Sequence, residues 1–166
     1  MQDIERLLES GADKVSINTS AILDPSLVGN AAKKFGSQCI VVAVDSKREG
    51  DKSYVYTHGG KNKTAFETSA WIKIVEGEGA GEILLTSMDR DGTKIGFDNE
   101  LTSSITNDLS IPLITSGGAG SIDHMIEGIS DGKADAVLAA SIFHQKEITI
   151  AEVKEGLASK GIEVRL

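Results

Sequence analysis

The stretch ITSGGAGS, residues 114–121, holds the pattern from which the fold is predicted. An aliphatic run, Pro112–Thr115, leads into a turn with three glycines, and a segment with helical spacing begins at Ile122. A short apolar run bounded by glycines is typical of a buried strand, and the polar turn after it marks a helix start. The sequence therefore predicts one βα unit, with a tight turn that exposes backbone N–H groups between strand and helix.

The same order of strand and helix recurs on both sides of this unit. Because the elements alternate, the strands form a parallel sheet, either open or closed into a barrel. The other predicted strands are Lys14–Ile17, Cys39–Val44, Glu82–Leu85 and Ala136–Leu138. The predicted helices are Met1–Ser10, Pro25–Phe35, Thr64–Glu78, Asn99–Leu109, Ile122–Ser130 and Ile150–Lys160.

The length of 166 residues predicts one domain, 1–166, with no internal boundary. A complete eight-stranded barrel needs about 250 residues. Five βα units at roughly 30 residues each fit the observed length. The helix predicted over Met1–Ser10 has no strand before it, so we expect the chain to begin within the fold, as part of a (β/α)₈ barrel.

Composition excludes several classes of function. The 17 basic and 25 acidic residues give a net charge of −8, which disfavours nonspecific binding to nucleic acid or to an anionic membrane. No apolar stretch reaches the roughly 18 residues of a membrane span. The single cysteine, Cys39, permits no disulfide and favours a reducing cytoplasm. We predict that Cys39 lies in the core and that Trp71 packs between helices rather than stacking on a ligand.

An insertion between Asp45 and Thr64 is predicted to form a hairpin. Tyr54, Val55 and Tyr56 alternate in type after a charged turn, which is typical of a strand with one buried face. Loops that follow the C-terminal ends of barrel strands often carry function. A purely solvated loop is the alternative, and the sequence leaves both interpretations open.

Two neighbouring strand ends carry small residues suited to an anion. Gly117, Gly118 and Gly120 follow one strand, and Ala139–Phe143 follows the next. In barrels the loops after the last two strands often share one phosphate site, so we predict phosphate binding here rather than purely structural turns. Another polar cluster, Ser16–Ser20, is either a second anion site or an ordinary helix cap.

Acidic residues at strand ends are the candidates for chemistry. Asp45 ends the run CIVVAVD and is a candidate proton shuttle, with a loop cap as the alternative. The loop MDRDGTKIG, residues 88–96, is predicted to be a mobile ligand clamp; it lacks the spacing of a calcium loop, and we predict no metal site. The histidines show no ligand spacing and are assigned no chemistry: His58, His124 and His144.

Four segments together resemble one enzyme family. GADKVSINTSA, FGSQCIVVAVDSKR, GAGEILLTSMDRDGTKIGFD and SGGAGS, in this order and spacing, resemble the cyclase subunit of imidazole glycerol phosphate synthase, from histidine biosynthesis. The resemblance implies a cytoplasmic lyase without a cofactor. It takes ammonia from a glutaminase partner and converts a ribulosyl aminoimidazole carboxamide bisphosphate into imidazole glycerol phosphate and an aminoimidazole carboxamide ribonucleotide.

Two alternatives remain beside the cyclase. The related phosphoribosyl isomerase of the same pathway shares the phosphate turns but differs in the loop TSMDRDGTKIGFD and in SINT. A non-catalytic phosphate-binding module, or an oligomerised barrel fragment without a function of its own, is the alternative from another class.

The resemblance also assigns roles to residues. Asp45 matches the general acid/base, Thr86 the wall of the site, and Lys14 with Glu82 a charged gate for ammonia. In the alternative of a non-catalytic module, glutaminase contacts would lie around Lys14 and Gln38. The residues implied for substrate and phosphate are Asn18 and Thr19 at one end, Ser116, Gly117, Gly118, Ala139 and Ser141 at the other, and Asp91 and Gly92 on the clamp loop.

The five strands match the fourth to eighth strands of the family's barrel, and this sets two expectations. The family's second catalytic aspartate, after its first strand, and the glycine-rich turn after its third strand have no counterpart here. Unpaired strand edges tend to pair with another chain, so we expect self-association, as a dimer.

Overall fold

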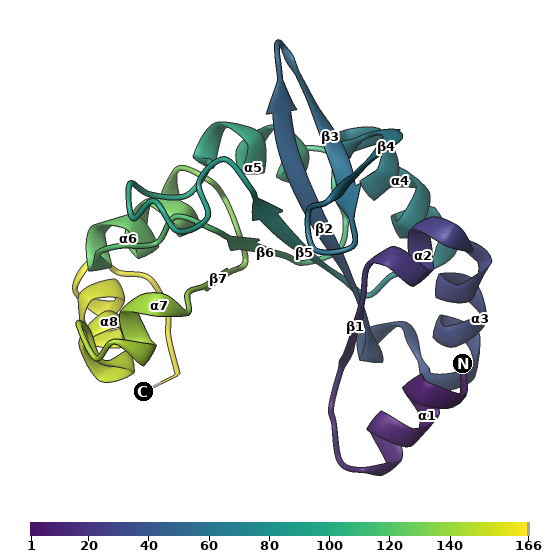
Figure 1. Ribbon diagram of the computed structural model, residues 1–166. Helices are drawn as coiled ribbons and strands as arrows, with labels where there is room; N and C mark the ends of the chain where they lie inside the picture. The colour runs from purple at the N-terminus through teal and green to yellow at the C-terminus, as the bar shows by residue number, and fades with distance from the viewer. Residues whose placement is uncertain (166) are drawn as a thin grey trace. The chain divides into compact units, whose positions relative to one another are not determined.

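The structure is a computed structural model that describes residues 1–165 (Figure 1). Strands and helices alternate along the chain, as predicted. The helices are α1 (Gln2–Glu9), α2 (Thr19–Leu23), α3 (Ser26–Phe35), α4 (Thr68–Glu78), α5 (Asn99–Thr106), α6 (Ile122–Ser130), α7 (Ser141–His144) and α8 (Ile150–Ser159), with a 3₁₀ turn η1 at Ser37–Cys39. The strands are β1 (Val15–Ile17), β2 (Ile40–Glu49), β3 (Lys52–Thr57), β4 (Asn62–Glu67), β5 (Glu82–Ser87), β6 (Leu113–Ser116) and β7 (Ala136–Leu138).

The predicted fold class is confirmed. The strands are hydrogen-bonded in the order β4-β3-β2-β5-β6-β7, and β1 pairs with β2. The pairs β1·β2 and β6·β7 are parallel, with Val15 opposite Ile40 and Ile114 opposite Ala136. Alternating βα units around a mostly parallel sheet are those of part of a (β/α)₈ barrel.

The predicted hairpin is confirmed and is longer than expected. β2 pairs antiparallel with β3, from Asp45 opposite Tyr56 to Glu49 opposite Lys52. β3 pairs antiparallel with β4, so residues 64–67 are strand and not the start of a helix as predicted. The reason is alternation: in NKTAFE the side chains of Thr64 and Phe66 are half-buried, whereas Lys63 and Ala65 are exposed.

The chain divides into two compact units. The N-terminal unit comprises residues 1–85 with 109–113, and the C-terminal unit comprises residues 86–108 with the chain from 114 onward. β5 and β6 have residues in both units. Each unit is described by itself below.

The core of the N-terminal unit surrounds β2. The run IVVAV is buried at Ile40, Val41, Val42 and Val44, as expected for a strand covered on both faces. Trp71 is fully buried, and its ring centroid lies 5.0 Å from that of Phe66 in β4. It is a packing residue, as predicted.

Cys39 was predicted to lie in the core, and this is wrong. It ends the 3₁₀ turn before β2 and is only partly buried. The reason is that the strand begins one residue later than predicted, at Ile40, whose side chain is the first of the run to be buried.

The core of the C-terminal unit lies between α6, α8 and the loops beside them. Its buried members are Phe97, Ala119, Met125, Ile142, Val153 and Leu157. α6 begins at its N-cap Ser121, whose hydroxyl accepts from the His124 N–H, and α8 begins with a capping box of Thr149 and Glu152. These caps fix where α6 starts after the turn of β6 and where α8 starts after α7.

A carboxylate fastens α4 to the segment that leads into β6. Ser110 donates its backbone N–H and its hydroxyl to Glu76 Oε1, at 2.7 and 2.6 Å, and Lys73 Nζ lies 3.1 Å from Oε2. The Ser110 hydroxyl and then its backbone N–H hold the pKa of Glu76 below its usual value. Each bond favours the charged carboxylate.

We predict that Glu76→Gln lowers the free energy of unfolding by about 1 kcal/mol near neutral pH, because two donors lose a charged acceptor. A lowered folded-state pKa stabilises the fold above the ordinary glutamate pKa of about 4.3, and this contribution is lost as pH falls through the lowered pKa. Urea unfolding of both proteins at decreasing pH measures the difference. Glu78→Gln, in the same helix, is the control; equal effects of the two substitutions at all pH values would contradict the assignment.

Candidate functional site

Asp45 and Asn18 lie together in the N-terminal unit. Asp45 is a half-buried residue of β2, and Asn18 stands at the N-cap position of α2, directly after β1, without a side-chain capping bond. Asn18 Nδ2 donates to Asp45 Oδ2 at 3.0 Å. The other amide atom, Asn18 Oδ1, is buried and has no hydrogen-bond partner in the described protein. The amide therefore fixes one oxygen of the carboxylate and keeps an acceptor for a further group.

Thr19 is tied to the hairpin rather than to Asp45. Its Oγ1 accepts from the backbone N–H of His58 at 3.1 Å. His58 has a positive φ of 55°, and its Nδ1 lies 3.0 Å from Thr57 Oγ1 and 3.3 Å from Asn62 Nδ2. His58 thus holds the tip of the β3–β4 hairpin against the turn after β1. Sequence reasoning gave it no role, because a histidine in a turn has no spacing pattern to identify it.

The two predicted gate residues form an ion pair. Lys14 Nζ lies 2.8 Å from Glu82 Oε2; the glutamate side chain is 14% exposed and the lysine side chain 51%. Lys14 precedes β1, whereas Asn18 follows it. The ion pair and the Asn18–Asp45 pair therefore lie at opposite ends of β1.

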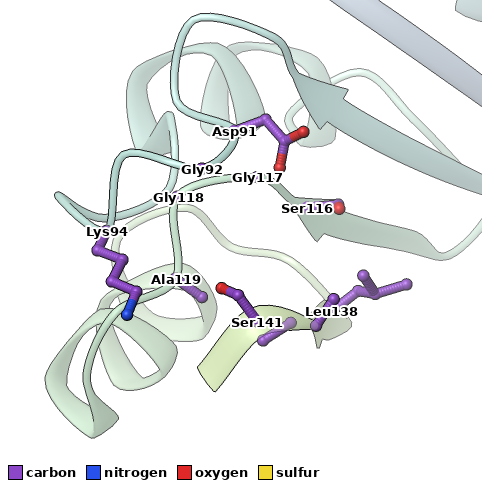
Figure 2. Close-up of a pocket in the computed structure, with 11 residues that line it drawn as sticks. Asp91, Gly92, Lys94, Ser116, Gly117, Gly118, Ala119, Leu138 and Ser141 are labelled. Carbon is purple, nitrogen blue, oxygen red and sulfur yellow. The ribbon is translucent and has the colours of Figure 1, made fainter. Parts of the chain in front are cut away.

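A pocket in the C-terminal unit collects most of the other predicted site residues (Figure 2). It lies where β6 and β7 end and where the loop after β5 returns. Seven predicted residues line it: Asp91, Gly92, Ser116, Gly117, Gly118, Ala139 and Ser141. Four that were not predicted join them: Lys94, Ala119, Leu138 and Ala140.

The wall of this pocket is built by close packing of the clamp loop, residues 88–96, on the glycine turn, residues 117–120. The Gly96 N–H donates to the Gly118 carbonyl at 2.8 Å. A Cβ on Gly118 would lie 2.2 Å from the Gly96 oxygen, and one on Gly120 would lie 2.5 Å from the Lys94 oxygen. Gly118 also has a φ of +105°. The glycines therefore serve the approach of two backbones as well as the turn itself.

One prediction about this turn is wrong. Gly120 was expected to expose its N–H to a ligand, but that N–H donates to His124 Nδ1 at 3.1 Å. The cause is that α6 begins at Ile122. Its first turn places the imidazole of His124, four residues after Gly120, over the glycine turn. His124 also lies against Gly96, where a Cβ would be 3.4 Å from its ring. His124 thus fastens the glycine turn to the clamp loop.

Thr86 is the one predicted substrate residue of this unit that does not line the pocket. It is half-buried in β5, next to the buried Ser87. Ser87 accepts the N–H groups of Arg90 and Asp91 at its carbonyl, at 3.2 and 2.9 Å. These bonds begin the clamp loop and place Asp91 at the pocket.

Lys94 is a pocket residue that sequence reasoning missed. Its Nζ lies 2.5 Å from Glu147 Oε1 and 3.2 Å from Gln145 Oε1. A lysine within a segment already predicted to be a ligand clamp was the available signal.

The described residues 1–165 contain no group of three or more His, Cys, Asp or Glu side chains able to hold a metal ion. No helix among them is long and apolar enough to cross a membrane.

The fold and these strand-end turns define a class, the (β/α)-barrel proteins that carry their ligand sites where parallel strands end. The sequence matches the family described as "Histidine biosynthesis protein" over residues 1–149. The chain belongs to this family. It is therefore a member of a family of histidine-biosynthetic enzymes, as the sequence predicted at that level.

We predict that Gly118→Ala destabilises the C-terminal unit by about 2–4 kcal/mol, since a positive φ and a collision with the Gly96 carbonyl combine. Gly92→Ala is the matched control: Gly92 also has a positive φ, but a Cβ there meets nothing within 4 Å. It should cost only about 1–2 kcal/mol. Urea unfolding measures both, and hydrogen exchange over residues 88–96 should rise only in Gly118→Ala. Equal destabilisation by the two would contradict the packing argument.

Proposed function

We propose that this chain is the cyclase of its family, which uses ammonia from a glutaminase partner to convert a ribulosyl aminoimidazole carboxamide bisphosphate into imidazole glycerol phosphate and an aminoimidazole carboxamide ribonucleotide. The observation that carries the proposal is the Lys14–Glu82 ion pair, at the end of β1 opposite Asn18 and Asp45. Ammonia chemistry needs an entrance separate from the substrate side. An isomerisation needs no second entrance, so the pair favours the cyclase.

Asp45 is the general acid/base of this reaction. When ammonia attacks the ribulosyl carbonyl carbon, the new C–N bond leaves the nitrogen with a proton to lose, and a carboxylate within reach accepts it. Asn18 Nδ2 donates to Asp45 Oδ2 at 3.0 Å and so fixes the orientation of the carboxylate. The same carboxyl group returns that proton to the former carbonyl oxygen, which leaves as water when its C–O bond breaks. The ribonucleotide leaves in a later step, when the new nitrogen closes the imidazole ring and the C–N bond to the aminoimidazole breaks.

The pocket of the C-terminal unit binds one phosphate of the substrate. Ser116 and Ser141 offer hydroxyl donors, and the turn at Gly117 and Gly118 offers backbone N–H donors. Asp91, on the clamp loop, accepts from a substrate hydroxyl. By the resemblance, Asn18 and Thr19 take the other phosphate, and the buried amide of Asn18 supports a polar ligand there.

The isomerase of the same pathway is the second candidate. Its substrate carries the same phosphate groups, so the pocket serves either reaction. The discriminating observable is the requirement for ammonia, since the isomerase reaction proceeds without it.

Turnover tests the cyclase directly. The chain should convert the ribulosyl bisphosphate when an ammonium salt is supplied, and Asp45→Asn should lower kcat by roughly 10²-fold or more, because a general acid/base is lost. Asp51→Asn, in the exposed turn of the same hairpin, should leave kcat unchanged. If no ammonia-dependent product forms, the cyclase proposal is wrong. Conversion of the isomerase substrate without ammonia would instead establish the second candidate.

Self-association as a dimer forms part of the proposal. Among residues 1–165, β1 is paired only with β2 and β7 only with β6, so each offers an unpaired edge. Leu138 of β7 is 39% exposed. Such edges attract a further strand. Light scattering at micromolar concentration should give the mass of a dimer, and a monodisperse monomer would contradict this.

A further inference from the structure

Lys94 is the only cation among the residues that line the pocket of the C-terminal unit, and Asp91 is the only anion. Figure 2 shows Lys94 on the clamp loop beside the turn of Gly118 and Ala119. Without Lys94, the side chains of the pocket would carry a net negative charge. A phosphate monoester carries about −1.5 to −2 at neutral pH, so the lysine decides whether the local field favours it.

The ammonium group of Lys94 is held by groups outside the pocket. Glu147 Oε1 and Gln145 Oε1 accept from Nζ at 2.5 and 3.2 Å. Both charged side chains are exposed, Lys94 at 39% and Glu147 at 40%. Exposed ion pairs contribute little to stability and are screened by salt, so a ligand of higher charge can replace the glutamate.

The backbone of Lys94 is fixed by packing, whereas its side chain is held only by an exposed ion pair and an amide contact. Its φ is +59°, and its main chain is packed against Gly120, where a Cβ would meet the Lys94 oxygen at 2.5 Å. A flexible four-carbon stem then carries the ammonium group. The charge can therefore move between Glu147 and the pocket without a change in the clamp loop.

We propose that Lys94 is the cation that selects a doubly charged phosphate monoester in this pocket, and that Glu147 competes with the ligand for it. The inference rests on the proposed phosphate site. When a phosphate enters, Lys94 exchanges the Glu147 carboxylate for a phosphate oxygen, and Glu147 is released to solvent. The ion pair thus sets the affinity of the pocket for phosphate, and anions of lower charge, such as carboxylates, do not displace Glu147 from Lys94.

Calorimetric titration with glycerol 3-phosphate tests this in the full chain. Lys94→Met should weaken binding by about tenfold, since a charge-assisted bond is lost. Glu147→Gln should tighten it by about threefold, because the competitor for Lys94 becomes neutral. In the double variant, Lys94→Met with Glu147→Gln, the second substitution should not increase the affinity for glycerol 3-phosphate, since Glu147 acts through Lys94. Lys94→Arg should keep most of the affinity.

Matched controls separate the ion pair from net charge. Lys146→Met removes the same charge next to Glu147 in sequence, and Glu155→Gln removes one from α8; neither residue lines the pocket. Both should leave affinity unchanged. If the wild type does not bind glycerol 3-phosphate, the proposed phosphate site is wrong and this inference falls with it. If the wild type binds and Lys94→Met binds equally well, only the role of Lys94 is overturned. Should Lys94→Met fold poorly, the Glu147→Gln comparison decides alone: unchanged affinity overturns the inference.

Discussion

The close approach of the clamp loop to the glycine turn is the constraint on which the pocket depends. A backbone hydrogen bond from the Gly96 N–H to the Gly118 carbonyl, at 2.8 Å, joins the two segments, and a Cβ on Gly118 would lie only 2.2 Å from the Gly96 oxygen. His124 fastens both from the start of α6. Because the backbones meet, Asp91 and Lys94 reach the same pocket as residues from the ends of β6 and β7. Without this contact the loop after β5 would be an independent surface loop.

The N-terminal unit follows the same rule with different chemistry. There the turn after β1 is held by side chains, through Asn18 on Asp45 and Thr19 on His58, and no glycine is needed. The hairpin that extends β2 carries His58 to this turn. In both units the parallel strands place the backbone, and a short segment after a strand is then locked by one or two hydrogen bonds. The result in the N-terminal unit is a carboxylate with a fixed orientation. The result in the C-terminal unit is a pocket lined mostly by small residues.

Much of the fold could be predicted from the sequence because its strands are short apolar runs between glycines. β7 and α6 have the predicted bounds. The errors occur where a local pattern is weak. α2 and α7 are too short to show helical periodicity, and residues 64–67 were assigned to a helix that tertiary pairing with β3 makes a strand.

The site was predictable in part, for a physical reason. Ser116, the last residue of β6, and Ser141, the first residue of the helix after β7, lie where the alternation of strands and helices puts them. Asp45 ends the predicted apolar run, although the hairpin extends β2 beyond it to Glu49. Lys94 could not be found in this way, because its significance depends on Glu147, 53 residues further along the chain. The Gly120 N–H was misassigned for a similar reason: its partner His124 belongs to the next helix. The roles of the predicted residues in catalysis stay predictions.

We propose that the turns after β6 and β7 and the clamp loop form one phosphate site. A titration of the ¹⁵N-labelled chain with glycerol 3-phosphate, followed by amide chemical shifts, tests it most directly. If the three segments form one site, the largest shifts fall on Gly117, Gly118 and Ser141, with smaller shifts on Asp91 and Gly92 at the same midpoint. Shifts confined to other segments, or separate midpoints for the turns and the clamp loop, would contradict it.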